Sequence, residues 1–359
     1  MSRGKLHAVI IAGGAGERFW PASRQKRPKP FLRVVDGRTL LEATLVRARR
    51  FAAKDCVWIV CGREHARDMR RETGLPAQRV LVEPRRRNTA MAVAFAAQHI
   101  AGHDPNAVLA VLPADHRIPD ARAFASAIRK AAAGARDGAL LTLGVRPTRA
   151  ETGYGYLQLG SAVGRRHAGL RRVKRFVEKP DAARARRYLR SGDYLWNAGI
   201  FVFGAQTILD EIREHAPELH RALAPLRQSP RVRSGKRVAA AYLRAPSLPI
   251  DVAVMERSRK VWTLPLKIHW SDVGTWLSLA EELGVFPGGT QVLGGELLFD
   301  ERGGNLVWGQ DGRGVALLGV EGLAVIETPD VLLVTKLESS PDVRKIVAQL
   351  KRRGRTDLT

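Results

Sequence analysis

A glycine-rich loop near the amino terminus holds the residues best suited to phosphate chemistry. It follows the apolar run 7–12, and two basic residues come after it; in order these residues are Gly13, Gly14, Gly16, Arg18 and Lys29. Glycine permits a positive φ and leaves its backbone N–H exposed, so glycines that end a buried strand can wrap a phosphate. The two cations would neutralise further negative charge. These residue types therefore favour the binding of a polyphosphate.

Two common kinds of phosphate loop do not fit this stretch. A P-loop ends in Gly-Lys-Ser/Thr, whereas Glu-Arg-Phe occupies positions 17–19. A dinucleotide-binding loop needs a third glycine where Phe19 stands, followed by an uninterrupted helix. Prolines at positions 21, 28 and 30 interrupt that region. We therefore expect a long irregular loop, with a purely structural glycine turn as the alternative.

Two aspartates lie where predicted elements end or begin, and one of them, Asp115, is a candidate metal ligand. Asp115 follows the apolar run 107–112, which predicts a buried strand, and open α/β sheets bind ligands at the carboxyl ends of their strands. Mg²⁺ commonly uses one or two carboxylates together with substrate phosphates. Asp272 precedes a glycine and a predicted helix start, which by itself suits a plain N-cap. A turn or capping role is likewise the alternative for Asp115.

The elements that would position these residues alternate along the chain. Apolar strand-like runs and helical segments alternate over residues 5–145, which predicts βαβ units and an α/β fold with a Rossmann-like, mostly parallel sheet. Further helices are expected over 39–50, 64–73 and 209–220. From residue 287 onward the chain has short β-like stretches, many glycines and one terminal helix over 342–353. We therefore expect a domain over 1–286 and a small C-terminal β domain over 287–359.

The order of these motifs resembles a known enzyme family. G-G-x-G-x-R, then Pro, then Pro-Lys is similar to the opening of the sugar-phosphate nucleotidylyltransferases. The Phe19-Trp20-Pro21 variant resembles the mannose-1-phosphate guanylyltransferase (GDP-mannose pyrophosphorylase) branch. One departure is Pro30, which stands where the branch often has glutamine. The resemblance implies that Arg18 and Lys29 neutralise the reacting triphosphate, and that the C-terminal domain is a short β-solenoid, although no clean hexapeptide repeat supports this.

The same resemblance assigns the remaining site residues. The nucleotide-binding residues it implies are Ala12, Gly13, Gly14, Gly16, Glu83, Pro84, Asn88 and Thr89, where helix capping is the alternative for Asn88. The sugar-phosphate residues it implies are Gly155, Glu178, Lys179 and Asn197. For Glu178 and Lys179 to reach one ligand, the strand must end or bulge there, which Pro180 favours. The metal residues are Asp115 and Asp272, with Mg²⁺ as the cofactor; Asp251 lies in a further matching run.

The reaction implied is GTP plus α-D-mannose 1-phosphate giving GDP-mannose and pyrophosphate. The sugar phosphate would attack the α-phosphorus in line, with catalytic roles for Arg18, Lys29, Asp115 and Asp272 and no covalent intermediate. Two alternatives remain open. One is the same chemistry on another sugar 1-phosphate, such as glucose 1-phosphate, or on another nucleotide. The other is a non-catalytic regulatory or nucleic-acid-binding relative.

The composition limits the partners. The formal net charge is +25, yet the basic residues are dispersed along the chain and aromatic residues make up only 6%, so no specific nucleic acid is expected. No apolar run approaches the roughly 18 residues of a membrane span, and no cleavable apolar segment precedes the first strand; we expect a cytoplasmic protein that uses no membrane. A homodimer is left open. Cys56 and Cys61 lack the spacing of a redox or metal pair and are expected to be structural.

Overall fold

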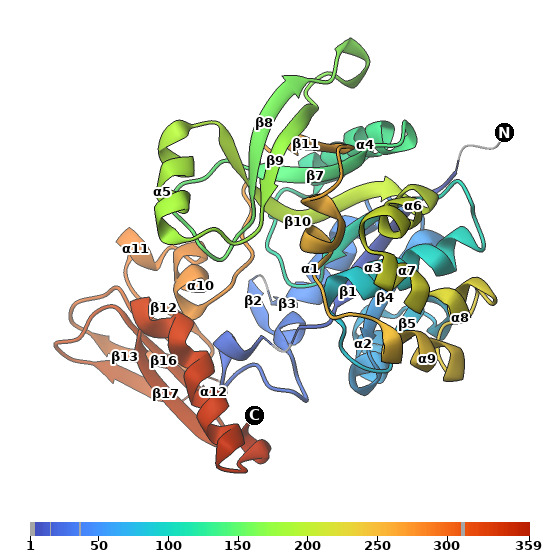
Figure 1. The fold of residues 1–359 in the computed structure, drawn as a ribbon. Helices are drawn as coiled ribbons and strands as arrows, with labels where there is room; N and C mark the ends of the chain where they lie inside the picture. Colours follow the sequence, from blue (N-terminus) through green and yellow to red (C-terminus); the bar gives the residue numbers. More distant parts are fainter. Residues whose placement is uncertain (1–3, 15, 36, 310–312) are drawn as a thin grey trace. The chain divides into compact units, whose positions relative to one another are not determined.

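The computed structural model describes residues 4–14, 16–35, 37–309 and 313–359 (Figure 1). The chain divides into two compact units: unit 1 comprises residues 1–13, 44–114 and 118–270, and unit 2 comprises residues 14–43, 115–117 and 271–359. Each unit has its own hydrophobic core. These units divide the chain differently from the predicted ranges 1–286 and 287–359, because the glycine-rich loop packs with the C-terminal residues. The predicted ranges stay a prediction about domain organisation.

Unit 1 is built on a nine-stranded sheet with the order β5-β4-β1-β6-β10-β7-β11-β9-β8. Its strands are β1 Leu6–Ala12, β4 Val57–Gly62, β5 Val80–Glu83, β6 Val108–Pro113, β7 Leu140–Val145, β8 Tyr156–Ala162, β9 Arg171–Val177, β10 Tyr194–Gly204 and β11 Val261–Pro265. The first four in this order are parallel, and β4 is buried along its whole length, as its apolar sequence predicts. β10 is antiparallel to both β6 and β7 and separates them. The predicted α/β fold class is confirmed, with a mixed second half of the sheet.

Helices pack against this sheet and shape its core. Those within unit 1 are α2 Ala66–Thr73, α3 Asn88–Ala101, α4 Ala121–Arg136, α5 Ala182–Ser191, α6 Ala205–His215, α7 Pro217–Ala222, α8 Ala224–Arg227 and α9 Lys236–Arg244; α1 spans Leu40–Ala48. The alanine-rich α3 shares one hydrophobic cluster with β1, β6 and α6. The helix predicted over 209–220 is instead two helices. Pro217 starts the second one, since proline lacks the N–H that a continuous helix would need and suits a first turn.

Unit 2 contains a short parallel β-coil. Its strands are β2 Arg33–Val35, β3 Arg38–Thr39, β12 Gln291–Leu293, β13 Glu296–Asp300, β14 Leu306–Trp308, β15 Gly314–Leu317, β16 Leu323–Thr328 and β17 Val331–Lys336; its helices are α10 Trp276–Glu282, α11 Val285–Gly288 and α12 Val343–Arg352. β12, β14 and β16 stack in parallel on one face, and β13 and β15 pair in parallel on another. The buried amide of Asn305 donates to Gly303 O and Val320 O and accepts from Leu323 N, which joins successive coils. The predicted sheet-rich C-terminal domain is confirmed.

Two further sequence expectations can be compared with the structure. Cys56 and Cys61 are both buried and free, and burial raises the pKa of the Cys61 thiol to about 12, which suits a structural role. Across the described ranges, no helix combines the length and the apolar character needed to cross a membrane.

Candidate active site

Lys29 contacts both candidate metal-binding aspartates of unit 2, one through its carboxylate and the other through its main chain. Its Nζ donates to Asp115 Oδ2 at 2.8 Å and to the main-chain oxygen of Asp272 at 2.6 Å. The Lys29 side chain is 8% exposed and that of Asp115 is 31% exposed. Burial works to raise the pKa of Asp115, but the charges of Lys29 and His116 and the hydrogen bond from Lys29 outweigh it and lower that pKa. Asp115 is therefore an ionised carboxylate with access to solvent.

The glycine-rich loop is folded closely around Lys29. Gly16 has φ 65°, and a Cβ added there would lie 2.4 Å from Lys29 Cβ and 2.9 Å from Ser23 Oγ. Only glycine meets both the conformational and the steric requirement at this position. Arg18 lies in a short 3₁₀ helix over Glu17–Phe19 and is exposed. Among the residues that the structure describes, no group forms a hydrogen bond or an ion pair with the Arg18 guanidinium.

A cluster of aromatic side chains in unit 2 anchors this loop. The rings of Phe19 and Trp276 have centroids 4.8 Å apart, and Trp276 packs in turn against Trp308 of β14 at 5.4 Å. The indole N–H of Trp20 donates to Leu358 O at 2.7 Å. Of these tryptophans, the sequence motif Phe19-Trp20-Pro21 points only to Trp20. Their structural role is to attach the loop that carries Arg18 and Lys29 to the C-terminal β-coil.

The four predicted sugar-phosphate residues also come together, in unit 1. A Cβ built on Gly155 would lie 2.7 Å from Glu178 Oε2 and 3.3 Å from Asn197 Cβ, so the absence of a side chain lets these groups approach. β9 ends at Val177, and Lys179 Nζ then lies 2.7 Å from Glu178 Oε1. The strand ends before the two residues, as predicted, so both side chains reach the same place.

Asp251 joins this group through Asn197. Asn197 Nδ2 donates to Asp251 Oδ1 at 2.9 Å, while Asn197 Oδ1 accepts from Thr142 Oγ1 at 2.6 Å. Burial and then the charge of Glu178 raise the pKa of Asp251 to about 7. Asp251 opens a π-helical turn over Asp251–Met255, and Glu256 just beyond it accepts from the Glu178 N–H. The turn that positions Asp251 could not be foreseen, because π-helical hydrogen bonding has no clear sequence signal.

The predicted nucleotide residues of unit 1 lie at the carboxyl ends of β1 and β5. Glu83 ends β5, and its Oε2 would be 3.6 Å from a Cβ built on Gly13, directly after Ala12. Tyr242 on α9 donates from its hydroxyl to Glu83 Oε1 at 3.1 Å. Burial raises the pKa of Glu83 to about 7, against the effect of that hydrogen bond. The role of Tyr242 at this site was not predicted from the sequence, because its position in α9 is that of an ordinary residue on the apolar face of the helix.

The turn after Glu83 leads into the start of α3. Pro84 is half-buried in this turn. Asn88 is exposed and its Oδ1 accepts from the N–H of Thr89 at 2.8 Å, while Arg87, not Asn88, occupies the N-cap position. Thr89 Oγ1 accepts from Ile250 N at 2.9 Å. Thr89 therefore has a structural contact, whereas the side chain of Asn88 remains accessible to a ligand.

Backbone strain coincides with the predicted motifs. Among the described residues, three non-glycine residues have positive φ: Asn88 at 60°, Lys179 at 48° and Val273 at 45°. Asn88 and Lys179 are candidate site residues themselves, and Val273 directly follows the candidate Asp272. Such strain is costly for a β-branched residue like valine, and it is typical of functional sites. The strain was not predictable from sequence, yet it lies in the motifs predicted to bind the base, the sugar and the metal.

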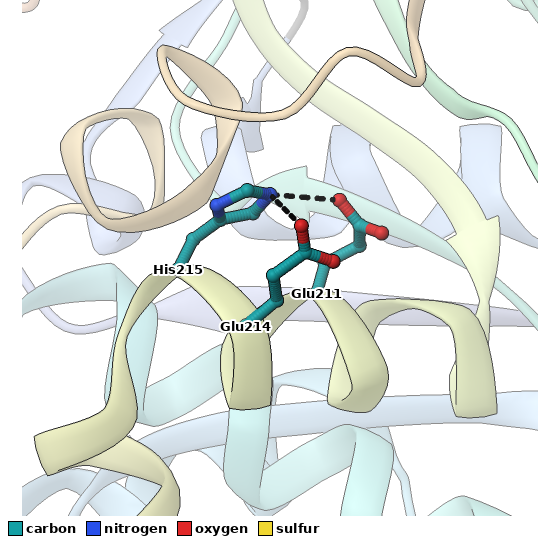
Figure 2. A group of neighbouring side chains, drawn as sticks. All are labelled: Glu211, Glu214 and His215. Atoms are coloured by element: carbon teal, nitrogen blue, oxygen red, sulfur yellow. Dashed lines mark ion pairs between the residues drawn. The ribbon is translucent and has the colours of Figure 1, made fainter.

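A separate group of potential metal ligands lies on α6. Glu211, Glu214 and His215 are the one set of three or more such residues found within the described ranges (Figure 2). The buried carboxylate of Glu211 already pairs with Lys260 Nζ at 2.7 Å and with His215 Nε2 at 3.3 Å. Both carboxylate oxygens of Glu211 are therefore already engaged, and the group lies outside the predicted motifs. We regard this group as a structural ion-pair network.

Comparisons with known proteins agree with this arrangement. The family model "Nucleotidyl transferase" matches residues 7–284, and the model "MannoseP isomerase/GMP-like beta-helix domain" matches residues 301–350. The xanthan biosynthesis protein XanB of Xanthomonas campestris pv. campestris (strain B100) is 37% identical, over 98% of this chain and 74% of its own length. The mannose-1-phosphate guanylyltransferase of Escherichia coli (strain K12) is 34% identical, over 99% and 75%.

A solved structure extends the similarity to the fold. The crystal structure of a protein from Thermus thermophilus, named mannose-1-phosphate geranyltransferase, has a TM-score of 0.88 and 36% identity. The match covers 97% of this chain and 99% of that one. The chain therefore belongs to the nucleotidyl transferase family, in the branch of the mannose-1-phosphate guanylyltransferases, and is an enzyme that transfers a nucleotidyl group to a sugar phosphate.

Proposed function

We propose that this enzyme transfers GMP from GTP to α-D-mannose 1-phosphate, giving GDP-mannose and pyrophosphate. The observation that carries the proposal is the contact of one buried ammonium group, Lys29 Nζ, with the carboxylate of Asp115 and with the main-chain oxygen of Asp272. This arrangement places a cation, the carboxylate of Asp115 and the backbone of Asp272 together, which suits charge neutralisation during transfer between phosphates. The choice of mannose and guanine is further supported by the relative in Escherichia coli that is named for this reaction.

The residues fit a bound Mg²⁺. Magnesium prefers oxygen ligands and usually takes one or two carboxylates in addition to substrate phosphates and water. The lowered pKa of Asp115 keeps that carboxylate ionised at neutral pH, and its partial exposure leaves it open to an ion. Asp115 and Asp272 would hold the ion, which would supply charge neutralisation on the triphosphate.

The side chains of each unit would then have distinct tasks. In unit 2, Lys29 and the guanidinium of Arg18 would stabilise the negative charge that develops as the sugar phosphate oxygen attacks the α-phosphorus and pyrophosphate leaves. In unit 1, Lys179 would bind the sugar phosphate and Glu178 would accept hydrogen bonds from sugar hydroxyls. The nucleophile is already anionic, so the reaction needs no general base.

Glu83 is suited to recognise guanine. Guanine presents an N–H and an adjacent NH₂ group as donors, and a carboxylate accepts two such bonds side by side. Tyr242 fixes one oxygen of Glu83 in place, and Gly13 has no side chain to fill the space beside the other. Two donors from the base would favour the ionised form of Glu83 on binding. An adenine base lacks this pair of donors, so ATP would be a poor substrate.

The test is a matrix of the four nucleoside triphosphates against several sugar 1-phosphates, with pyrophosphate release as the readout. We expect GTP with mannose 1-phosphate to give the highest kcat/KM. A higher value for another pair, such as glucose 1-phosphate with a different nucleotide, would keep the reaction type and overturn the assigned substrates. The variants Asp115→Asn and Asp272→Asn should each lose several kcal/mol of transition-state stabilisation, and together lose little more, since both would act through one ion. Asp193→Asn, at an exposed position, is the matched control.

A further inference from the structure

A pocket of about 680 Å³ opens at the amino-terminal ends of β1 and β4 in unit 1. It is lined by His7 of β1, Trp58 of β4 and His99 near the end of α3. The predicted nucleotide residue Gly13 follows the opposite end of β1. Because a strand rises about 3.3 Å per residue, roughly 20 Å separate His7 from Gly13. The pocket is therefore distinct from the predicted nucleotide residues of the same unit.

The charge of this pocket is positive. Four basic residues and two acidic ones line it, which gives a net charge of +2: Lys5, Arg79, Arg231 and Arg233, and Asp55 and Asp104. Lys5 and Asp55 form an exposed pair at 2.9 Å and offset each other. The three arginines thus face a single remaining carboxylate. Such a surface attracts anions.

The arginines are held in place by contacts that leave other N–H groups available. Arg231 Nε donates to Gly102 O at 3.1 Å, and Arg233 Nη1 donates to Ala77 O at 2.9 Å. The guanidinium of Arg79 lies over the ring of Trp58, 4.3 Å from its centroid. Within the described ranges, no group forms a hydrogen bond or an ion pair with the guanidinium of Arg79. A guanidinium has five N–H donors, so each arginine retains several for a ligand.

His7 adds a buried donor to the wall of this pocket. Its Nδ1 accepts from the indole N–H of Trp58 at 3.0 Å, and since that group can only donate, the proton of the neutral ring lies on Nε2. Nε2 is buried and has no hydrogen-bond partner in the described part of the chain; Asp104 Oδ2 lies 3.8 Å away. Burial lowers the pKa of His7 to about 4, so the ring is neutral at pH 7. A buried N–H donor without a partner calls for an explanation, such as a bound water or a ligand.

We propose that this pocket is a second binding site, for a small phosphorylated molecule, in which Arg79, Arg231 and Arg233 bind the phosphate. A guanidinium group can donate to two phosphate oxygens at once. A carboxylate ligand has only one such pair of oxygens, so it would engage only one of the arginines in this way. The pocket is larger than a phosphate ion and within the usual size of small-molecule sites. The ligand is therefore a phosphate ester with an organic part, either a sugar phosphate or a nucleoside monophosphate.

Calorimetric titration of the full chain tests the proposal with three probes: inorganic phosphate, glucose 6-phosphate and AMP. We expect one of the two esters to bind more tightly than inorganic phosphate, which identifies the kind of organic part. Arg79→Gln and Arg233→Gln should each weaken that binding at least tenfold. Arg186→Gln, at an exposed position on α5, removes the same charge and should leave the dissociation constant within about twofold.

Lys179→Met separates this site from the proposed substrate site. Binding of the probe should persist in this variant, because Lys179 belongs to the proposed sugar-phosphate group. The proposal is overturned if neither ester binds below about 1 mM, if binding survives both arginine substitutions, or if Lys179→Met abolishes it. Two separate arginine variants, each checked by its thermal unfolding midpoint, ensure that a folding defect in one does not decide the result.

Discussion

Lys29→Met is the substitution that most directly tests how the candidate site is held together. It removes the ammonium group that contacts Asp115 and Asp272 and keeps an unbranched side chain of similar length. The hydrogen bond to an ionised carboxylate contributes roughly 1.5–3 kcal/mol and that to a carbonyl about 1 kcal/mol. Water can reach Asp115, which is 31% exposed, and will replace part of this. We expect the free energy of unfolding at pH 7 to fall by about 2–3 kcal/mol.

The sign of the pH dependence follows from the lowered pKa of Asp115. A carboxyl group whose folded pKa lies below its unfolded value, 3.8, stabilises the protein above that value, and the contribution is lost as the pH falls through the folded pKa. Lys29→Met removes a main cause of the lowering, so the pKa of Asp115 should rise. The stability difference between parent and variant should therefore be largest near pH 7 and shrink as the pH falls below about 4.

Urea unfolding of the parent, Lys29→Met, Asp115→Asn and the double variant at pH 7 and pH 3.5 measures this directly. The double variant should lose clearly less than the sum of the single losses, because the two side chains share one contact. Pyrophosphate release should be nearly abolished in every variant that lacks Lys29. Additive losses, or a stability difference that does not change with pH, would refute the pairing of Lys29 with Asp115.

Three further predictions address the loop, the base site and the β-coil. Gly16→Ala should lower kcat about 100-fold because its Cβ displaces Lys29. The control Gly74→Ala, at φ 63° with open space around it, should cost about 1 kcal/mol of stability and leave kcat unchanged. Equal kcat in both variants would contradict this. The pKa of Glu83 is raised from 4.5 to about 7 in the folded protein. The free energy of unfolding should therefore decrease by about 3 kcal/mol as the pH rises from about 4.5 through 7. Urea unfolding of Glu83→Gln should lack that decrease. Truncation after residue 286 removes the aromatic and apolar partners of Phe19 and Trp20 and should give an aggregating, inactive protein by size-exclusion chromatography and assay; a soluble, active product would show that the loop holds its shape alone.

The sequence predicted those features that depend on local pattern. The apolar runs of β1, β4 and β6 mark buried strands, because burial on both faces leaves an uninterrupted apolar run. The ligand-binding role of the glycines after β1 stays a prediction. The grouping of Gly155, Glu178 and Asn197 followed from the resemblance, and the structure brings these residues together. The substrates and the metal stay predictions.

Features that depend on distant pairing were not predictable. The run that forms β10 reads as a strand, but nothing in it specifies that it enters antiparallel between β6 and β7. Glu83 and Tyr242 are 159 positions apart, and no motif links them. The change near residue 287 to short β-like stretches with many glycines suggested a domain boundary there. The packing of Phe19 and Trp20 assigns the glycine-rich loop to the C-terminal unit as well. In each case tertiary contacts decided which of several locally acceptable structures the segment adopts.

Unit 2 is assembled from three separated segments, and this has a consequence for how the protein is made. Lys29 contacts residues that follow it by 86 and 243 positions, and Trp20 donates to a carbonyl 338 positions later. At a synthesis rate of about 5–20 residues per second, roughly 12–50 seconds pass between the emergence of Lys29 and that of Asp272. The strands of unit 1 are complete by residue 265 and can pair during that interval. Lys29 thus meets its partners only late in translation, and a ribosome that stops early releases a chain without this group.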